Sequence, residues 1–147
     1  MWIANFSKEN IEKGLHFAPN NNTILIQIQD PDTKEFVKSP YFKDFKEIHQ
    51  FKFWDAEDIT DLPNGITTGI ITNEQSNEIA LILETALKQE LNIIVHCHAG
   101  ICRSGAIVEA GSLLGFEVPE GINKRIPNRL VLKKIRTSLG LTFSWEE

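Results

Sequence analysis

Residues 92–108, NIIVHCHAGICRSGAIV, decide the fold of this chain. Residues 93–95 are β-branched and uncharged, which is typical of a buried strand. Residues 106–114 are mostly apolar and indicate a helix, and a short loop around Gly100 separates the two segments. A strand, a tight loop and a helix start form a cradle for an anion, because backbone N–H groups converge there and the helix dipole favours negative charge.

This loop carries a cysteine and an arginine six positions apart, Cys97 and Arg103. A thiol is a strong nucleophile only when ionised, and a helix N-terminus with cationic neighbours favours ionisation. The guanidinium of Arg103 can hold two phosphoryl oxygens at once. We expect Gly100 to let the backbone approach the ligand without a Cβ clash, and Ser104 to donate a hydrogen bond to the sulfur. These residue types predict covalent catalysis on a phosphate ester in two displacements.

The order His-Cys, five residues, Arg, Ser at positions 96–104 resembles the signature loop of the cysteine-dependent protein tyrosine phosphatases, in their compact dual-specificity and microbial branch. The resemblance extends more weakly through about residues 45–140. It implies hydrolysis of phosphate monoesters through a phosphocysteine intermediate, with protein phosphotyrosine as substrate and phosphoserine or phosphothreonine as further ones. It implies no cofactor and no metal. The loop residues expected to bind the substrate are His98, Ala99, Gly100, Ile101, Cys102 and Arg103.

Phosphatases of this type also carry an aspartic acid, on a loop some tens of residues before the signature, that protonates the leaving oxygen. Ligands of α/β sheets bind beyond the carboxyl ends of the strands, so the loop after an expected strand at 47–54 supplies the candidates. Asp55, which directly follows that strand, is our first choice for the acid. Asp58 is the second and Asp61 a third. The alternative is that all three carboxylates only solvate a surface loop.

Cys102 lies in the same loop, directly before the arginine. The low-molecular-weight tyrosine phosphatases place a second cysteine there, which can close a disulfide that shields the nucleophile. A low-pKa thiolate beside a second thiol is poised for reversible oxidation. The other interpretation is a small apolar loop filler, and the sequence leaves both open. His96 is expected to be structural. The close histidines and cysteines suggest a metal site, but they lack a second spaced ligand pair.

The composition is ordinary for a soluble globular domain. The 147 residues carry a formal net charge of −5 and are 41% hydrophobic, which predicts one domain over residues 1–147 with a real core. No signal-peptide pattern and no membrane-spanning apolar run is evident. Two cysteines in one loop do not form a long-range disulfide framework, so we expect a reducing, cytoplasmic location. We further expect a monomer that acts on a phosphorylated protein or peptide and has no membrane partner.

Two other functions stay open at the level of sequence. A phosphate-binding module without turnover would use the same cradle, but the intact Cys97, Arg103 and Ser104 argue against it. An enzyme acting on RNA 5′ ends or phosphoinositides would favour basic residues around the cleft. Basic residues do gather near the C-terminus: Lys124, Arg125, Arg129, Lys133, Lys134 and Arg136. A solvated helix face is the commoner explanation of such a run, and we do not expect nucleic acid as a partner.

Strands and helices alternate along the chain. Strands are expected at residues 2–6, 23–29, 47–54 and 92–95. Further helices are expected after N-caps at Ser7, Thr72 and Asn128, with Thr72 and Gln75 in a capping box. The pattern predicts a three-layer α/β fold, with a central, mainly parallel sheet of about four or five strands flanked by helices.

Overall fold

The computed structural model describes residues 1–121 and 123–140. The strands are β1 (Ile3–Ser7), β2 (Thr23–Gln29), β3 (Glu47–Lys52) and β4 (Asn92–Cys97). The α-helices are α1 (Lys8–Lys13), α2 (Asn73–Lys88), α3 (Arg103–Leu114) and α4 (Arg129–Ser138). Two single 3₁₀ turns, η1 (Phe42–Asp44) and η2 (Ile59–Asp61), lie in the loops on either side of β3.

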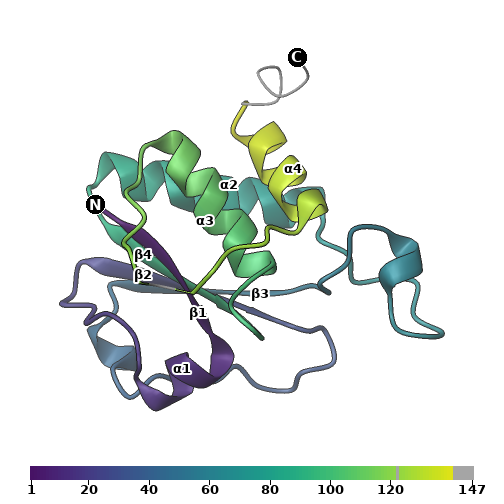
Figure 1. The fold of residues 1–147 in the computed structure, drawn as a ribbon, viewed down its shortest axis with the longest axis horizontal. Coiled ribbons are helices and arrows are strands. Elements are labelled where there is room, and N and C mark those ends of the chain that lie inside the picture. The colour runs from purple at the N-terminus through teal and green to yellow at the C-terminus, as the bar shows by residue number, and fades with distance from the viewer. Residues whose placement is uncertain (122, 141–147) are drawn as a thin grey trace.

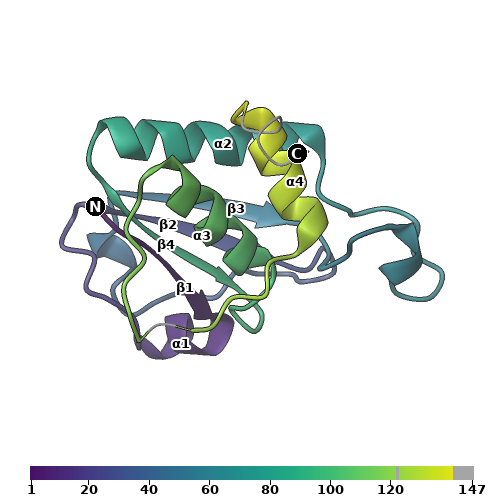
Figure 2. The same ribbon diagram turned by 45° about the horizontal axis from the view of Figure 1, so that its top comes forward.

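The four strands form one parallel sheet in the order β1-β4-β2-β3. Helices α2, α3 and α4 cover one face of this sheet and α1 lies on the other (Figure 1). Figure 2 shows α2 running along the top of the molecule, with α4 crossing it near one end. The predicted three-layer α/β fold with a mainly parallel sheet is therefore confirmed.

Side-chain alternation in the strands explains the two cores. Ile24, Ile26 and Ile28 of β2 face the large core under α2, α3 and α4. Leu25 points the opposite way, into a smaller core that it shares with Ile11 of α1. Every residue of β2 is buried, as expected for an inner strand of a parallel sheet with helices on both faces.

The predicted caps form as expected, while some strand ends shift. Ser7 caps α1, and Thr72 and Gln75 form the capping box of α2. The expected strand at 47–54 is too long, because β3 ends at Lys52. The register with β2 ends at Gln29, and the turn that follows β2 contains Pro31. Phe53 still donates its N–H to the Gln29 carbonyl at 3.2 Å, but Trp54 donates to Gly69 of its own loop at 2.8 Å. Asp55 therefore lies in a loop, three residues beyond the end of β3 at Lys52.

The topology creates a crevice at the end of the sheet where the strands have their carboxyl ends. The chain leaves β1 into α1 on one face of the sheet, whereas it leaves the neighbouring strand β4 into α3 on the opposite face. Chains that leave neighbouring strands toward opposite faces create a ligand site beyond the carboxyl ends of those strands. The loop between β3 and α2, residues 53–72, projects beyond this edge (Figure 1).

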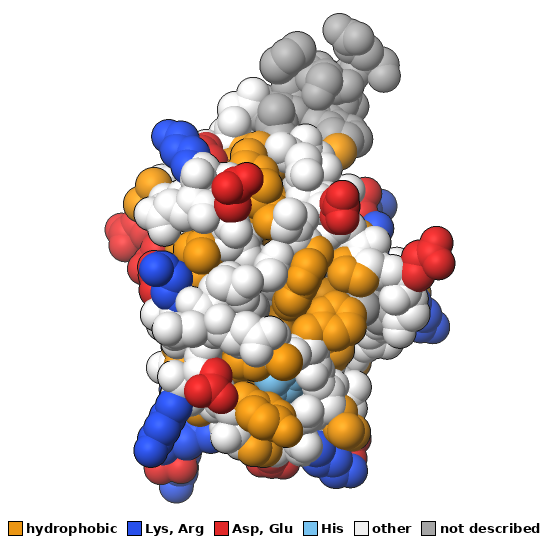
Figure 3. Space-filling view, turned by 90° about the vertical axis from the view of Figure 1, so that its left-hand side faces the viewer, with side chains coloured by type: hydrophobic (Ala, Val, Ile, Leu, Met, Phe, Trp, Pro, Cys, Tyr) orange, Lys and Arg blue, Asp and Glu red, His pale blue; other side chains and the backbone are white. Residues whose placement is uncertain are grey.

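The opposite edge has a different surface. Figure 3 shows hydrophobic side chains gathered in the middle of that side, with a histidine among them and charged groups around the rim. Among the described residues, no helix combines the length and the apolar composition needed to cross a membrane.

Candidate active site

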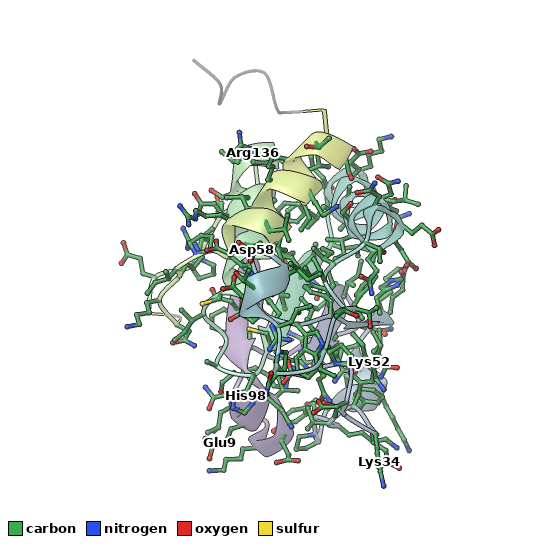
Figure 4. All side chains as sticks on the ribbon, turned by 90° about the vertical axis from the view of Figure 1, so that its right-hand side faces the viewer. Glu9, Lys34, Lys52, Asp58, His98 and Arg136 are labelled. Atoms are coloured by element: carbon green, nitrogen blue, oxygen red, sulfur yellow. The ribbon has the colours of Figure 1, made fainter. Side chains whose placement is uncertain are left out.

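A pocket of about 270 Å³ lies at the carboxyl edge of the sheet, where β2, β3 and β4 end. The lining residues come from the loops after these three strands: Asp30, Trp54, Asp55, Asp61, Pro63, Cys97, His98, Ala99, Cys102 and Arg103. Figure 4 looks onto this edge, with η2 and Asp58 above His98. The structure therefore brings the predicted cysteine loop and the predicted acid loop to one pocket.

Cys97 is the last residue of β4 and is buried at the pocket base. Its Sγ lies 3.2 Å from the Ser104 hydroxyl, and the backbone N–H of Ser104 donates to the same sulfur at 3.5 Å. Because Ser104 lies in the first turn of α3, the helix N-terminus is directed at the thiol. The N–H and the hydroxyl are thus both available as hydrogen-bond donors to the sulfur.

The carbonyl groups of the loop all point away from the pocket. Each carbonyl from His98 to Cys102 accepts a hydrogen bond from a neighbouring element. The backbone N–H of Lys8 donates to His98 at 3.1 Å, and the Asn123 amide donates to Ala99 and Gly100 at 2.9 and 3.0 Å. The remaining two carbonyls, of Ile101 and Cys102, accept backbone N–H groups from residues 126 and 128 at 3.2 and 3.0 Å.

The backbone N–H groups of residues 99–103 must therefore point inward. A trans peptide holds its C=O and N–H on opposite sides, so each outward carbonyl turns the following N–H toward the pocket. No described residue accepts a hydrogen bond from these N–H groups. A run of converging, unpaired backbone donors is a binding site for an anion.

Buried Asn5 and Gly100 hold the loop against β1. Asn5 is 0% exposed, and its Nδ2 donates to the Gly100 carbonyl at 2.6 Å. Gly100 has φ +72°, and a Cβ at this position would lie 2.4 Å from the Phe6 carbonyl carbon. The expected reason for this glycine needs correction, because the missing side chain admits the β1 backbone rather than the ligand.

Arg103 presents a free edge of its guanidinium to the pocket. Its Nη1 donates to Asp30 Oδ1 at 2.7 Å and to the Phe53 carbonyl at 2.8 Å. Its buried Nε has no hydrogen-bond partner among the described residues. The side chain is only 4% exposed, so an unpaired charged donor here is costly unless a ligand completes it. The Nε edge is thus suited to hold two oxygens of an oxyanion.

The three aspartates considered for the acid have different surroundings. Asp55 and Asp61 line the pocket, whereas Asp58 does not. The Asp58 side chain caps η2, and its hydrogen bonds from Thr60 hold its pKa below the ordinary value. The carboxylate of Asp61 accepts backbone N–H groups of the loop itself, at 2.9 Å from Glu57. Asp55 accepts a bond from the Asn128 amide at 2.8 Å.

Cys102 and His96 lie on either side of Cys97 in the sequence and have different surroundings. Cys102 is a free thiol that lines the pocket. Burial raises the pKa of this thiol, and the carboxylate of Asp55 raises it further by its charge and by a hydrogen bond. Burial lowers the pKa of His96 to about 4, so its imidazole is neutral at pH 7. Its Nε2 lies 3.2 Å from the Gln27 amide, on the neighbouring strand, and not in the pocket.

The charge around the pocket comes mostly from carboxylates. Arg103 is the only lysine or arginine among the lining residues, against Asp30, Asp55 and Asp61. The basic run near the C-terminus does not reach this pocket, and two of its members are paired elsewhere. Arg125 bonds Glu109 at 3.1 Å, and Arg129 bonds Glu57 at 3.1 Å. Backbone dipoles, more than side-chain charge, must supply the positive potential for an anion.

Sequence reasoning missed three groups of this site: Asp30, Asn5 and Asn123. Asp30 follows β2 directly, and the rule that ligand groups follow strand ends could have found it. The two asparagines are not marked by any local sequence pattern, because their partners are distant in the sequence. Asn5 is 95 residues from Gly100, and Asn123 is 24 residues from Ala99. Within residues 1–121 and 123–140, no three metal-ligating side chains lie close enough together to hold an ion.

Comparisons with known proteins add little to this geometry. No protein-family model matches the sequence, and no curated protein matches it. Among solved structures, the chain is similar to one described as Tk-PTP in its active form. The TM-score is 0.45 and the sequence identity 16%, over 92% of this chain and 77% of that one.

Proposed function

We propose that this protein is a cysteine-dependent phosphatase of the tyrosine and dual-specificity superfamily, with one domain over residues 1–147. It hydrolyses phosphate monoesters of proteins, with phosphotyrosine as the expected substrate and phosphoserine or phosphothreonine as further ones. The observation that carries this proposal is the orientation of the loop after β4. Its carbonyls all accept hydrogen bonds from neighbouring elements, so its unpaired N–H groups face the pocket that Cys97 lines.

In the first step the Cys97 thiolate attacks phosphorus, and the bond from phosphorus to the ester oxygen breaks. The inward N–H groups and the Nε edge of Arg103 hold the phosphoryl oxygens. Asp55 gives its proton to the leaving oxygen. In the second step water attacks the phosphocysteine, Asp55 takes the proton of this water, and inorganic phosphate leaves. The Ser104 hydroxyl, 3.2 Å from the sulfur, stabilises the thiolate as it departs.

The charges of the pocket favour a phosphoprotein over a polyanion. Three carboxylates line the pocket beside a single arginine, which disfavours RNA ends or inositol lipids with further phosphates nearby. A substrate with a single phosphate monoester has its negative charge only at the loop N–H groups and Arg103, and brings no further phosphate near these carboxylates. A monomer in a reducing, cytoplasmic location is part of the proposal. The reducing location suits the mechanism, because Cys97 must be a free thiol to attack phosphorus. The sensitivity of Cys97 and Cys102 to oxidation stays a prediction.

The test is hydrolysis of an aryl phosphate by the wild-type protein and by Cys97→Ser. We expect phosphate release by the wild type, a covalent phosphocysteine in rapidly quenched samples, and neither in the variant. Arg103→Lys should lose roughly tenfold to a hundredfold in kcat/KM, because a point charge cannot replace bidentate bonds of about 1.5–3 kcal/mol each.

The controls separate the remaining functions. A parallel panel contains a phosphotyrosine peptide, a phosphothreonine peptide, an RNA 5′-triphosphate and a phosphoinositide. Equal hydrolysis by wild type and Cys97→Ser would contradict the proposal. Tight phosphopeptide binding without turnover by the wild type would instead identify a binding module.

A further inference from the structure

Asn128, at the start of α4, joins three parts of the molecule and is only 4% exposed. Its backbone N–H donates to the Cys102 carbonyl at 3.0 Å, which ties it to the nucleophile loop. Its Oδ1 accepts the Val131 N–H at 3.0 Å, which caps α4. Its Nδ2 donates to Asp55 Oδ1 at 2.8 Å and to the Ala56 carbonyl at 3.2 Å.

The two ends of this amide have separate tasks. The oxygen satisfies the helix, as any good N-cap residue would. The nitrogen is not needed for the cap and is used entirely by the loop that carries Asp55. A serine cap would serve α4 as well. The helix alone therefore does not account for an asparagine whose buried nitrogen donates two hydrogen bonds.

The hydrogen bonds from Asn128 attach the first part of the projecting loop 53–72 to the start of α4. The neighbouring Arg129 donates its backbone N–H to Glu57 at 2.7 Å and its Nε to the same carboxylate at 3.1 Å. The arginine pair is largely exposed, and such pairs contribute little. The buried Asn128 amide is therefore the stronger of the two attachments between α4 and the loop.

We propose that Asn128 is the positioning residue of Asp55, an inference that rests on the proposed function. An amide nitrogen only donates, so Asp55 Oδ1 must offer it a lone pair. The carbonyl-type oxygen of a protonated carboxyl is the stronger acceptor, so this bond favours the proton on Oδ2. The same carboxyl faces the Cys102 thiol, whose pKa is raised most by burial and further by the charge of this carboxyl. Asn128 thus sets both the place of the acid and the oxygen that holds its proton, relative to the nucleophile loop.

The first test measures the attachment itself by hydrogen exchange of the wild type and Asn128→Ser. Serine keeps the cap and removes only the amide donor. We expect faster exchange over residues 55–62, with exchange in α4 and the melting temperature nearly unchanged. Arg129→Gln, which breaks only the exposed pair, is the matched control and should have a smaller effect. Unchanged exchange in Asn128→Ser would overturn the attachment.

The second test is a double-mutant cycle with Asp55→Ala, on aryl phosphates with good and poor leaving groups. Asn128→Ser should lower kcat about tenfold or more for the poor leaving group, because small misplacements of a catalytic group are costly. We expect less than about threefold for the good one, and an unchanged KM. In the Asp55→Ala background, Asn128→Ser should add nothing.

Losses that are additive, or equal for both leaving groups, would overturn the positioning role. Failure of the proposed function would look different, because the wild type would then release no phosphate. The exchange experiment would in that case still decide whether Asn128 anchors the Asp55 loop.

Discussion

At the scale of single residues, His96 shows how a neighbour of the nucleophile can be purely structural. Its imidazole is buried, and Gln27 Nε2 donates to its Nε2 at 3.2 Å. The proton therefore lies on Nδ1, which is 3.5 Å from the Cys97 carbonyl. The prediction that His96 is structural agrees with this geometry, in which the ring contacts the Gln27 amide and the Cys97 carbonyl.

We predict that His96 makes the protein sensitive to acid. Burial lowers its pKa from 6.5 to about 4, so between these values the unfolded chain binds more protons than the native one. Stability is then complete above pH 6.5 and falls as the pH drops toward 4, by on the order of 3 kcal/mol. Urea unfolding of wild type and His96→Gln across this range measures the difference.

The neutral amide of His96→Gln can still accept from Gln27 but cannot titrate. Its stability should therefore fall less steeply between pH 6.5 and 4 than that of the wild type. Parallel stability curves for the two proteins would contradict the assignment of this acid sensitivity to His96.

At the scale of elements, the loop between β3 and α2 divides its aspartates by task. In η2, Asp58 and Asp61 form a reciprocal capping box, which folds the loop on itself. Asp55 lies outside this turn and faces the pocket. The Asp58 carboxylate caps this turn, and its hydrogen bonds from Thr60 lower its pKa, so Asp58 is the poorer proton donor.

We predict that Asp55→Ala and Asp58→Ala separate catalysis from loop structure. Asp55→Ala should lose about a hundredfold or more in kcat on a phosphate ester with a poor leaving group, and much less on one with a good leaving group. Asp58→Ala should affect both esters alike and only slightly. Steady-state kinetics on the two esters measure this. A strong dependence on the leaving group for Asp58→Ala alone would move the acid role to Asp58.

At the scale of the whole molecule, the site depends on which strands are neighbours. The order β1-β4-β2-β3 places β1 beside β4, so that Asn5 can reach the Gly100 carbonyl. The same amide also donates to the Lys124 carbonyl at 3.2 Å. A single buried side chain thus connects the first strand, the nucleophile loop and the segment before α4.

We predict that Asn5→Ala impairs activity beyond its effect on stability. Loss of the buried bonds should destabilise the protein by about 1–3 kcal/mol. It also frees the Gly100 carbonyl on one side, so the following N–H is held less firmly toward the phosphate. We expect kcat/KM to fall about tenfold at a temperature where the variant is folded, which is less than the loss of a whole donor.

Thr23→Val is the matched control for this experiment. Thr23 is also buried, and its hydroxyl donates to the Pro19 carbonyl at 2.9 Å, but it lies at the other end of the sheet. It should lose stability and keep kcat/KM. Similar activity losses in both variants would show that Asn5 acts only through stability.

The sequence by itself determined the layers of this protein and the identity of its thiol and guanidinium. Hydrophobic periodicity and capping residues are local signals, so β2, the caps at Ser7, Thr72 and Asn128 and the parallel α/β class could be predicted from them. The spacing of Cys97 and Arg103 is equally local, because one short loop carries both.

Only the tertiary structure decided how that loop is oriented and completed. Asn5, Asp30 and Asn128 act on it from β1, from the end of β2 and from the start of α4. Such contacts depend on strand order and helix packing, which hydrophobic patterns do not specify. Whether a loop presents its N–H groups or its carbonyls to a ligand is set by the partners of its carbonyls, and these come from the rest of the fold.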